Sequence, residues 1–190
     1  WSKTGQHTGR TDLPLLDEGV HEAIEFGDRL VGYSDQAVLC LPEIGYILRS
    51  PRTRCVQTLE CMLGTEEQRK MMGMPNVQVL DDCREWDYGQ YEGQTTECIR
   101  KSRPGWNVFE HGTPSHETNP DLPGESPEQI SERADRVVKL IREWHQTTKK
   151  DVVIFTHGHF SNVLIGRFLR LPLSMSKVPV SYTHLRAHET

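Results

Sequence analysis

Two histidines, His157 and His159, stand on either side of one glycine, and imidazole rings are common in sites that move protons or charge. The short apolar run 152–155 precedes them and is typical of a strand covered on both faces, as in a parallel sheet. Apolar residues at helical spacing follow over 163–169. The histidines should therefore lie on a strand-to-helix turn, where open α/β sheets bind ligands. His-Gly-His alone is equally compatible with an ordinary polar turn.

A second candidate group follows another predicted strand, residues 46–50. Ser50 and Pro51 are typical of a helix start, with Ser50 as the N-cap and Pro51 at the first helical position. Arg52 and Arg54 would then lie in the first turn, where backbone amides and the positive end of the helix dipole favour a phosphate group. We interpret Arg52 as a solvated surface charge. For Arg54 both a surface role and a phosphate-binding role stay open.

The loop 81–93 is rich in carboxylates and aromatic rings and follows a predicted strand at 76–80. A carboxyl group packed against Trp86 and the neighbouring tyrosines would be partly removed from water, which favours its protonated form. A protonated carboxyl group suits a general acid, and Glu85 is the candidate. A solvated acidic loop is the alternative interpretation.

The remaining segments would position these groups. Residues 1–15 hold glycines, a proline and small hydroxyl residues, so we expect a loop whose backbone amides can meet a ligand. An amphipathic helix is predicted over 20–31, weakened by Gly27. Ser126, followed three residues later by Gln129, predicts the start of a helix whose apolar stripe belongs to the core.

The segment 101–124 contains prolines, glycines and large aromatic residues, which indicate an irregular insertion lying over a pocket. It also holds His111 and His116. These could ligate a metal together with the pair at 157 and 159, but their spacing resembles no zinc pattern. We therefore expect no metal site.

The composition limits the class of protein. A chain of 190 residues with 35% hydrophobic and 26% charged residues is one soluble domain. A net charge of -5 argues against general binding to nucleic acid or acidic membranes, and no segment approaches the apolar length of a membrane span. Five cysteines, an odd number without CxxC spacing, indicate reduced thiols in a reducing compartment, which we interpret as the cytoplasm.

The order and spacing of five short blocks carry a family resemblance. They occupy residues 1–15, 50–58, 85–89, 124–126 and 156–159. Together they resemble the histidine phosphatase superfamily, also called phosphoglycerate mutase-like. The closest likeness is to the branch of sedoheptulose-1,7-bisphosphatase and broad-specificity sugar-phosphate phosphatases.

The resemblance implies phosphoryl transfer through a phosphohistidine, with no cofactor or metal. The nucleophilic histidine belongs to an Arg-His-Gly motif that we expect a few residues before Trp1, and this chain does not contain it. Arg54 would clamp the phosphoryl group, His157 would stabilise its charge, and Glu85 would protonate the leaving alkoxide and later activate water. The substrate pocket would be lined by His7, Thr8, Gly9 and His159.

The expected fold is a three-layer α/β sandwich with a mostly parallel central sheet that lacks its first strand. The domain would span 1–179, because 180–190 resembles a translated sequencing adapter and not native protein. Asn162 stands where this branch is expected to carry an arginine, which leaves recognition of a second phosphate open.

The expected parent is a phosphatase acting on small phosphorylated metabolites such as sugar phosphates, with sedoheptulose 1,7-bisphosphate as one candidate, and with no nucleic-acid or membrane partner. This chain alone would be inactive. Mutase-type phosphoryl transfer and a non-catalytic binding protein are the alternatives.

Overall fold

The computed structural model describes residues 2–175, which form two compact units. Within these residues, the sheet unit comprises Leu13–Asp81 and Leu140–Phe155, and the loop unit comprises 2–12, Asp82–Lys139 and 156–175. The tail predicted to derive from an adapter, 180–190, lies outside the described residues. No helix of the described part has the length and apolar character that crossing a membrane requires.

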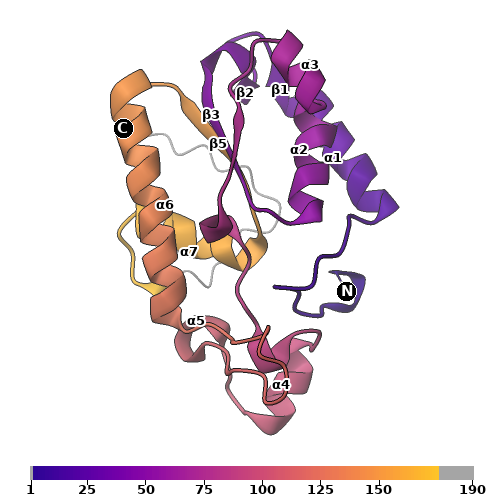
Figure 1. Cartoon of the computed structure of the whole chain (residues 1–190), viewed down its shortest axis with the longest axis vertical. Helices are drawn as coiled ribbons and strands as arrows, with labels where there is room; N and C mark the ends of the chain where they lie inside the picture. Colours follow the sequence, from indigo (N-terminus) through magenta and orange to yellow (C-terminus); the bar gives the residue numbers. More distant parts are fainter. Residues whose placement is uncertain (1, 176–190) are drawn as a thin grey trace. The chain divides into compact units, whose positions relative to one another are not determined.

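The sheet unit combines strands and helices (Figure 1), and its three longest strands are parallel in the order β4-β3-β5. Its elements are α1 (Asp17–Leu30), β1 (Val31–Gly32), β2 (Leu39–Cys40), β3 (Ile44–Arg49), α2 (Thr53–Leu63), α3 (Glu66–Met71), β4 (Val77–Val79) and β5 (Asp151–Phe155). The predicted strands at 46–50, 76–80 and 152–155 are thereby confirmed with small shifts of their ends. The expected α/β class with a parallel sheet is also confirmed.

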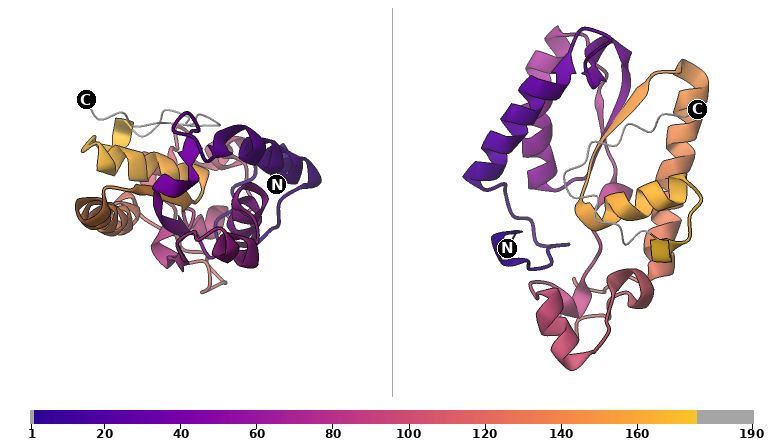
Figure 2. Two further views of the ribbon diagram at one scale, coloured as in Figure 1. Left: turned by 90° about the horizontal axis from the view of Figure 1, so that it is seen from above. Right: turned by 180° about the vertical axis from the view of Figure 1, so that it is seen from behind.

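A hydrophobic core joins the sheet to α2, with Ile47 of β3 and Leu59 of α2 almost wholly buried. α1 and α2 lie side by side (Figures 1 and 2). Gly27 permits this packing, because a Cβ atom there would lie 2.9 Å from the Cα atom of Met62. The glycine that weakens α1 as an isolated helix is therefore required where α1 meets α2.

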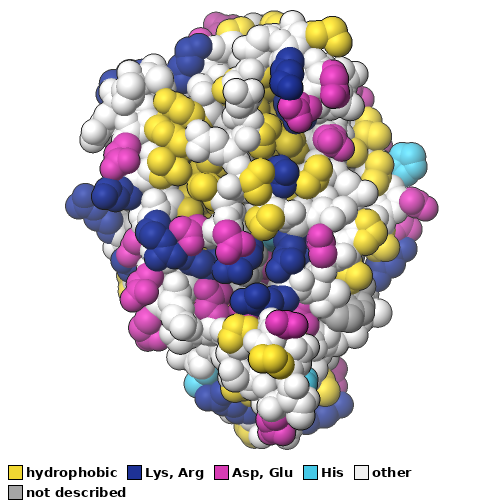
Figure 3. Space-filling view, viewed as in Figure 1, with side chains coloured by type: hydrophobic (Ala, Val, Ile, Leu, Met, Phe, Trp, Pro, Cys, Tyr) yellow, Lys and Arg dark blue, Asp and Glu magenta, His cyan; other side chains and the backbone are white. Residues whose placement is uncertain are grey.

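β5 is less covered than its apolar sequence predicts. Among the described residues it pairs with β3 alone, and Val152, Val153 and Ile154 are only half-buried. Hydrophobic side chains also gather on the surface over the strands of this unit (Figure 3). The expectation of a strand covered on both faces is wrong for the described residues, because three of its apolar side chains stay half-buried. β5 also lies at an edge of their sheet.

The start of α2 differs from the prediction. Ser50 is not its N-cap; the helix begins at Thr53 after the N-cap Arg52, whose side chain makes no capping bond. The Ser50 hydroxyl instead accepts a hydrogen bond from the Arg52 amide at 3.3 Å, closing a local turn before the helix. Arg54 nevertheless lies in the first turn, as expected.

The loop unit is built from short helices and long connections. Its helices are α4 (Thr96–Ser102), α5 (Val108–His111), α7 (Gly158–Phe168) and the first part of α6 (Pro127–Thr148), with short 3₁₀ turns at Ser2–Thr4, Asp81–Cys83, Gly89–Tyr91 and Leu173–Met175. The capping box that starts α6 is confirmed: Ser126 N donates to Gln129 Oε1 at 2.8 Å, and Gln129 N donates to Ser126 Oγ at 3.2 Å.

The segment 101–124 is not a simple irregular insertion. It contains α5 and the end of α4, and its aromatic residues belong to the core of the unit. Trp106 is 2% exposed, and its indole N–H donates to the carbonyl of Gly112 at 3.0 Å. Because a buried indole needs an acceptor, this bond fixes the ring and makes the segment structural.

Candidate active site

Glu85 caps the helix that carries the histidine pair. α7 begins at Gly158, directly after the N-cap His157, whose side chain makes no capping bond, so the predicted turn is confirmed. The Glu85 carboxylate takes the role of the missing cap. Its Oε2 accepts from His159 N at 3.0 Å and its Oε1 accepts from Phe160 N at 2.9 Å. A third amide, that of Trp86, donates to Oε1 at 2.9 Å.

These contacts reverse the predicted ionisation of Glu85. Burial alone would raise its pKa, but the positive charges of His159 and His157 and the donated amides outweigh burial, so the pKa lies below its usual value. The expectation of a protonated acid is therefore wrong for the protein without a ligand. The aromatic neighbours signalled desolvation correctly, but the amides of α7 belong to a distant part of the sequence.

His159 contacts Tyr88, which the sequence indicated only as an aromatic neighbour of the acid. Its Nδ1 atom lies 2.6 Å from the Tyr88 hydroxyl oxygen. His7 stacks on Tyr88 with ring centroids 4.5 Å apart, and its ring centroid lies 5.8 Å from that of His159. The structure thus brings His7, His159 and Glu85 together in one cluster of the loop unit.

His7 is a neutral member of this cluster. Burial, followed by the positive charge of His159, lowers the pKa of His7 to about 4, although Glu85 acts in the opposite direction. Its Nε2 atom lies 3.1 Å from the Thr96 hydroxyl. An imidazole that stays neutral at pH 7 can donate or accept a hydrogen bond without adding charge to the site.

The N-terminal loop that contains Thr8 and Gly9 is anchored by Glu92. The Glu92 carboxylate accepts from the amide of Gly9 at 3.0 Å and from that of Thr11 at 2.9 Å. Gly9 is buried, and a Cβ atom there would lie only 2.1 Å from the carbonyl oxygen of Trp86. The loop therefore packs directly against the loop that bears Glu85.

Thr156 and His157 join the end of β5 to the acid loop. The Thr156 hydroxyl donates to the carbonyl of Cys83 at 2.6 Å. His157 is buried, and its charge contributes to the lowered pKa of Glu85. The polar turn predicted at 156–159 is therefore tied to the loop 81–93 by side-chain and backbone bonds.

The two arginines lie in the sheet unit, at the start of α2. The structure therefore does not test the predicted clamping of a phosphate by Arg54 together with Glu85 and His157. Arg52 is not a simple solvated charge, because its Nε atom is buried without a hydrogen-bond partner in the described part of the chain.

Sequence reasoning missed two carboxylates of this site, Asp87 and Glu92, and considered Tyr88 only as an aromatic neighbour of Glu85. Asp87 pairs with Arg10 at 2.5 Å and accepts from Gly89 N at 3.0 Å. All three lie in the carboxylate-rich and aromatic-rich loop that drew attention to Glu85, which was the available signal. Their partners in the N-terminal loop and α7 are about eighty residues away in sequence, so spacing could not reveal them.

Nothing in residues 2–175 groups three His, Cys, Asp or Glu side chains as a metal site would. His111 and His116 serve their own loops instead: the Nδ1 of His111 accepts from Asn107 N at 3.1 Å, and that of His116 accepts from Asn119 N at 3.2 Å.

The chain belongs to the histidine phosphatase superfamily (branch 1), because the model of that family matches residues 1–189. The predicted family is thereby confirmed. The relatives found by comparison are phosphatases.

The chain is 37% identical to the acid phosphatase of Mycobacterium tuberculosis over 177 residues, which cover 92% of this chain and 72% of that protein. It is 36% identical to the sedoheptulose 1,7-bisphosphatase of Saccharomyces cerevisiae over 84% of this chain and 59% of that protein. A solved structure of a Mycobacterium tuberculosis open reading frame matches with a TM-score of 0.72 and 36% identity, over 93% of this chain and 77% of that one. The chain therefore spans only part of the length of these relatives.

Proposed function

We propose that this chain is the larger part of a phosphatase that hydrolyses phosphomonoesters of small metabolites through a phosphohistidine. The observation that carries the proposal is the Glu85 carboxylate on the first-turn amides of α7, between His157 and His159. A carboxyl group and two histidines at a helix N-terminus provide both a proton donor and a place for phosphate charge.

The reaction would proceed in two balanced steps. In the first, the imidazole of an upstream histidine attacks phosphorus; an N–P bond forms, the ester P–O bond breaks, and Glu85 gives its proton to the departing alkoxide. In the second, water attacks phosphorus, the N–P bond breaks, and the Glu85 carboxylate takes the proton of the water. His157 and Arg54 would stabilise the charge on the phosphoryl oxygens in both steps.

Glu85 must be protonated for the first step, whereas the α7 amides favour its ionised form. A bound phosphate resolves this conflict, because its negative charge next to Glu85 would raise the pKa of the carboxyl group. Phosphate oxygens can also compete for the same amides. We propose that substrate binding itself converts Glu85 from a helix cap into an acid.

The substrate class follows from the relatives and from the pocket residues. Two named relatives are an acid phosphatase and a sedoheptulose 1,7-bisphosphatase, which supports sugar phosphates as substrates. His7, Thr8, Gly9 and His159 would contact the sugar. Asn162 offers no positive charge to a second phosphate, so mono- and bisphosphates should be compared directly.

The decisive experiment uses the completed protein, meaning this chain preceded by the residues that its gene encodes before Trp1. Sequencing the source DNA across both ends should reveal Arg-His-Gly in frame upstream and different codons after residue 179. The completed protein incubated with a radiolabelled sugar phosphate should then form an acid-labile, base-stable phosphoenzyme, as expected for an N–P bond. His157→Asn should slow its formation, while the exposed His21→Gln should not.

The chain of 190 residues should show no turnover, because it lacks the nucleophile. Turnover of a sugar phosphate by this chain, abolished by His157→Ala, would refute that part of the proposal. An upstream start codon with no histidine would favour the non-catalytic binding protein instead.

Two further outcomes would redirect the assignment. Transfer of the phosphoryl group to a second hydroxyl of the substrate, and not to water, would indicate a mutase. Loss of activity with a chelator would indicate a metal-dependent hydrolase.

We further propose a reducing, cytoplasmic location, supported by the absence of a disulfide among the five cysteines, all of which lie in the described residues.

A further inference from the structure

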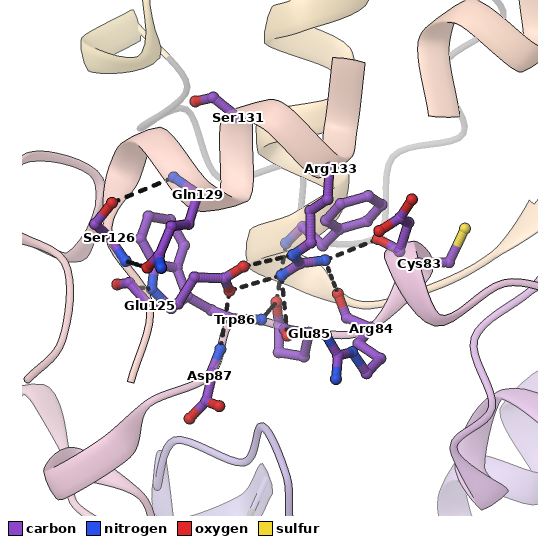
Figure 4. A network of polar contacts seen from close by, with 12 residues as sticks. Cys83, Arg84, Glu85, Trp86, Asp87, Glu125, Ser126, Gln129, Ser131 and Arg133 are labelled. Carbon is purple, nitrogen blue, oxygen red and sulfur yellow. Dashed lines mark hydrogen bonds and ion pairs between the residues drawn. The ribbon is translucent and has the colours of Figure 1, made fainter. Parts of the chain in front are cut away.

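Arg133 of α6 is a buried arginine whose hydrogen-bonding capacity is completely used (Figure 4). Its Nε donates to Glu125 Oε1 at 2.6 Å and its Nη2 to Glu125 Oε2 at 2.8 Å. The other donors reach backbone carbonyls: Nη1 to those of Asp82 at 2.8 Å and Arg84 at 2.7 Å, and Nη2 to that of Glu85 at 3.1 Å. A guanidinium group has five N–H donors, and here each has an acceptor.

Glu125, the partner of Arg133, holds the other side of the same loop (Figure 4). Its Oε2 accepts from the amide of Asp87 at 3.1 Å, and its carbonyl accepts from the indole of Trp86 at 3.0 Å. Arg133 and Glu125 together therefore bind the chain before, at and after Glu85. The loop has few conformations left once both contacts are made.

Arg133 also contacts the helix that receives the Glu85 carboxylate. Its guanidinium lies over the ring of Phe160, 4.6 Å from the centroid, and Phe160 N donates to Glu85 Oε1. The Arg133 side chain thus contacts both the backbone of Glu85 and Phe160, the residue whose amide donates to the Glu85 carboxylate. Arg133 therefore contacts both residues of the hydrogen bond that joins Glu85 to α7.

A buried ion pair is weak evidence for stability, since apolar residues of similar volume often replace such pairs without loss. The Arg133–Glu125 pair is instead bonded to the backbone on both sides of Glu85. We propose that the Arg133–Glu125 ion pair is a positioning device that holds Glu85 for proton transfer to the leaving group. The inference rests on the proposed function, and Arg133 is a positioning residue because all of its donors are bound within the protein.

The test compares two leaving groups in the completed protein. A p-nitrophenolate departs without a proton, whereas the alkoxide of glycerol 3-phosphate needs one. Arg133→Lys keeps the charge but loses the fixed fork of donors. Because Glu85 also activates water in the step that both substrates share, the rate to compare is that of phosphoenzyme formation in a single turnover. We expect this rate to fall by on the order of 10- to 100-fold with glycerol 3-phosphate and to change little with p-nitrophenyl phosphate. Glu125→Gln should give the same selective loss.

Arg136→Lys is the matched control. Arg136 lies one turn further along α6 and is exposed, and the hydrogen bonds by which it contacts the same loop go to the side chain of Asp82, at 2.7 Å and 2.9 Å. It should leave both rates unchanged. An equal loss on both substrates, or no loss, in Arg133→Lys and Glu125→Gln would overturn the inference.

The control that separates the two proposals is Glu85→Gln. If Glu85→Gln slows phosphoenzyme formation equally from both substrates, Glu85 is not the acid and the proposed function fails. If Glu85→Gln selectively slows phosphoenzyme formation from glycerol 3-phosphate and the Arg133 and Glu125 variants do not, only the present inference fails.

A second measurement needs no activity and uses the 190-residue chain itself. Carboxyl carbon NMR titration should place the pKa of Glu85 below its usual range in the wild type. Arg133→Lys should move this pKa toward the ordinary value, because the carboxylate loses its place against α7, while Arg136→Lys should not. An unmoved pKa in Arg133→Lys would also overturn the inference.

Discussion

α2 and α7 each follow a strand of the sheet, and each carries a predicted phosphate-binding residue near its start, Arg54 in α2 and His157 in α7. The first turn of α7 is capped by the carboxylate of Glu85. The N-cap of α2, Arg52, contributes no side-chain bond. One helix start is therefore occupied by an anion of the protein itself, whereas the other presents cations. Under the proposed function, Arg54 would attract the charge of the phosphate, whereas Glu85 would both cap α7 and react.

The largest effect should come from the cationic helix start. Arg54→Ala in the completed protein removes charge-assisted bonds to the transition state and should lower kcat/KM on a sugar phosphate by about 10²- to 10³-fold. Arg29→Ala, an exposed arginine of α1, is the control and should leave the rate unchanged. An unaltered rate in Arg54→Ala would show that the start of α2 does not bind the phosphoryl group.

The next effect concerns the histidine beside the capped helix start. Because the pKa of His7 falls to about 4 on folding, the unfolded chain binds a proton between pH 6.5 and 4 that the folded chain does not. Stability should therefore be complete above pH 6.5 and decline as the pH falls toward 4, by up to about 3 kcal/mol.

Urea unfolding of the 190-residue chain across this range measures the decline. His7→Gln should flatten it, while the exposed His21→Gln should not. Equal slopes for wild type and His7→Gln would show that His7 is not buried in its neutral form.

The smallest effect tests the cap itself. Glu85→Gln keeps the shape but removes the charge from the α7 amides and should lower the free energy of unfolding by about 1 kcal/mol at pH 7. Because the pKa of Glu85 is lowered by folding, this difference should persist above the ordinary carboxyl pKa of about 4.3 and vanish as the pH falls through the lowered value.

The exposed Glu22→Gln is the control for this cap. If Glu85→Gln is as stable as the wild type at pH 7, the charge of Glu85 at the start of α7 does not contribute to the free energy of unfolding.

The sequence predicted the features that depend on neighbours a few residues away. The capping box of Ser126 and Gln129 and the turn from β5 into α7 were both recognisable, because their partners lie within one helical turn. The start of α2 was misplaced by the local turn at Ser50. Local rules therefore gave the elements but not always their first residues.

The ionisation of Glu85 and its support could not be predicted in the same way. Both depend on α6 and α7, which lie about fifty and seventy residues further along the chain. One clue was present: Arg133 interrupts the apolar stripe of α6 between Ile130 and Ala134, both fully buried. A charged residue on a core-facing stripe indicates a buried partner, although the sequence does not say which one.

The close approach of Gly9 to the carbonyl of Trp86 limits how the N-terminal loop of this protein can be engineered. A library that randomises residues 7–10 would lose nearly every variant changed at position 9, because any side chain would enter the space of that carbonyl. Positions 7, 8 and 10 are half-buried, and the side chains of His7 and Arg10 contact Tyr88 and Asp87. A useful library should therefore fix the glycine and vary its neighbours.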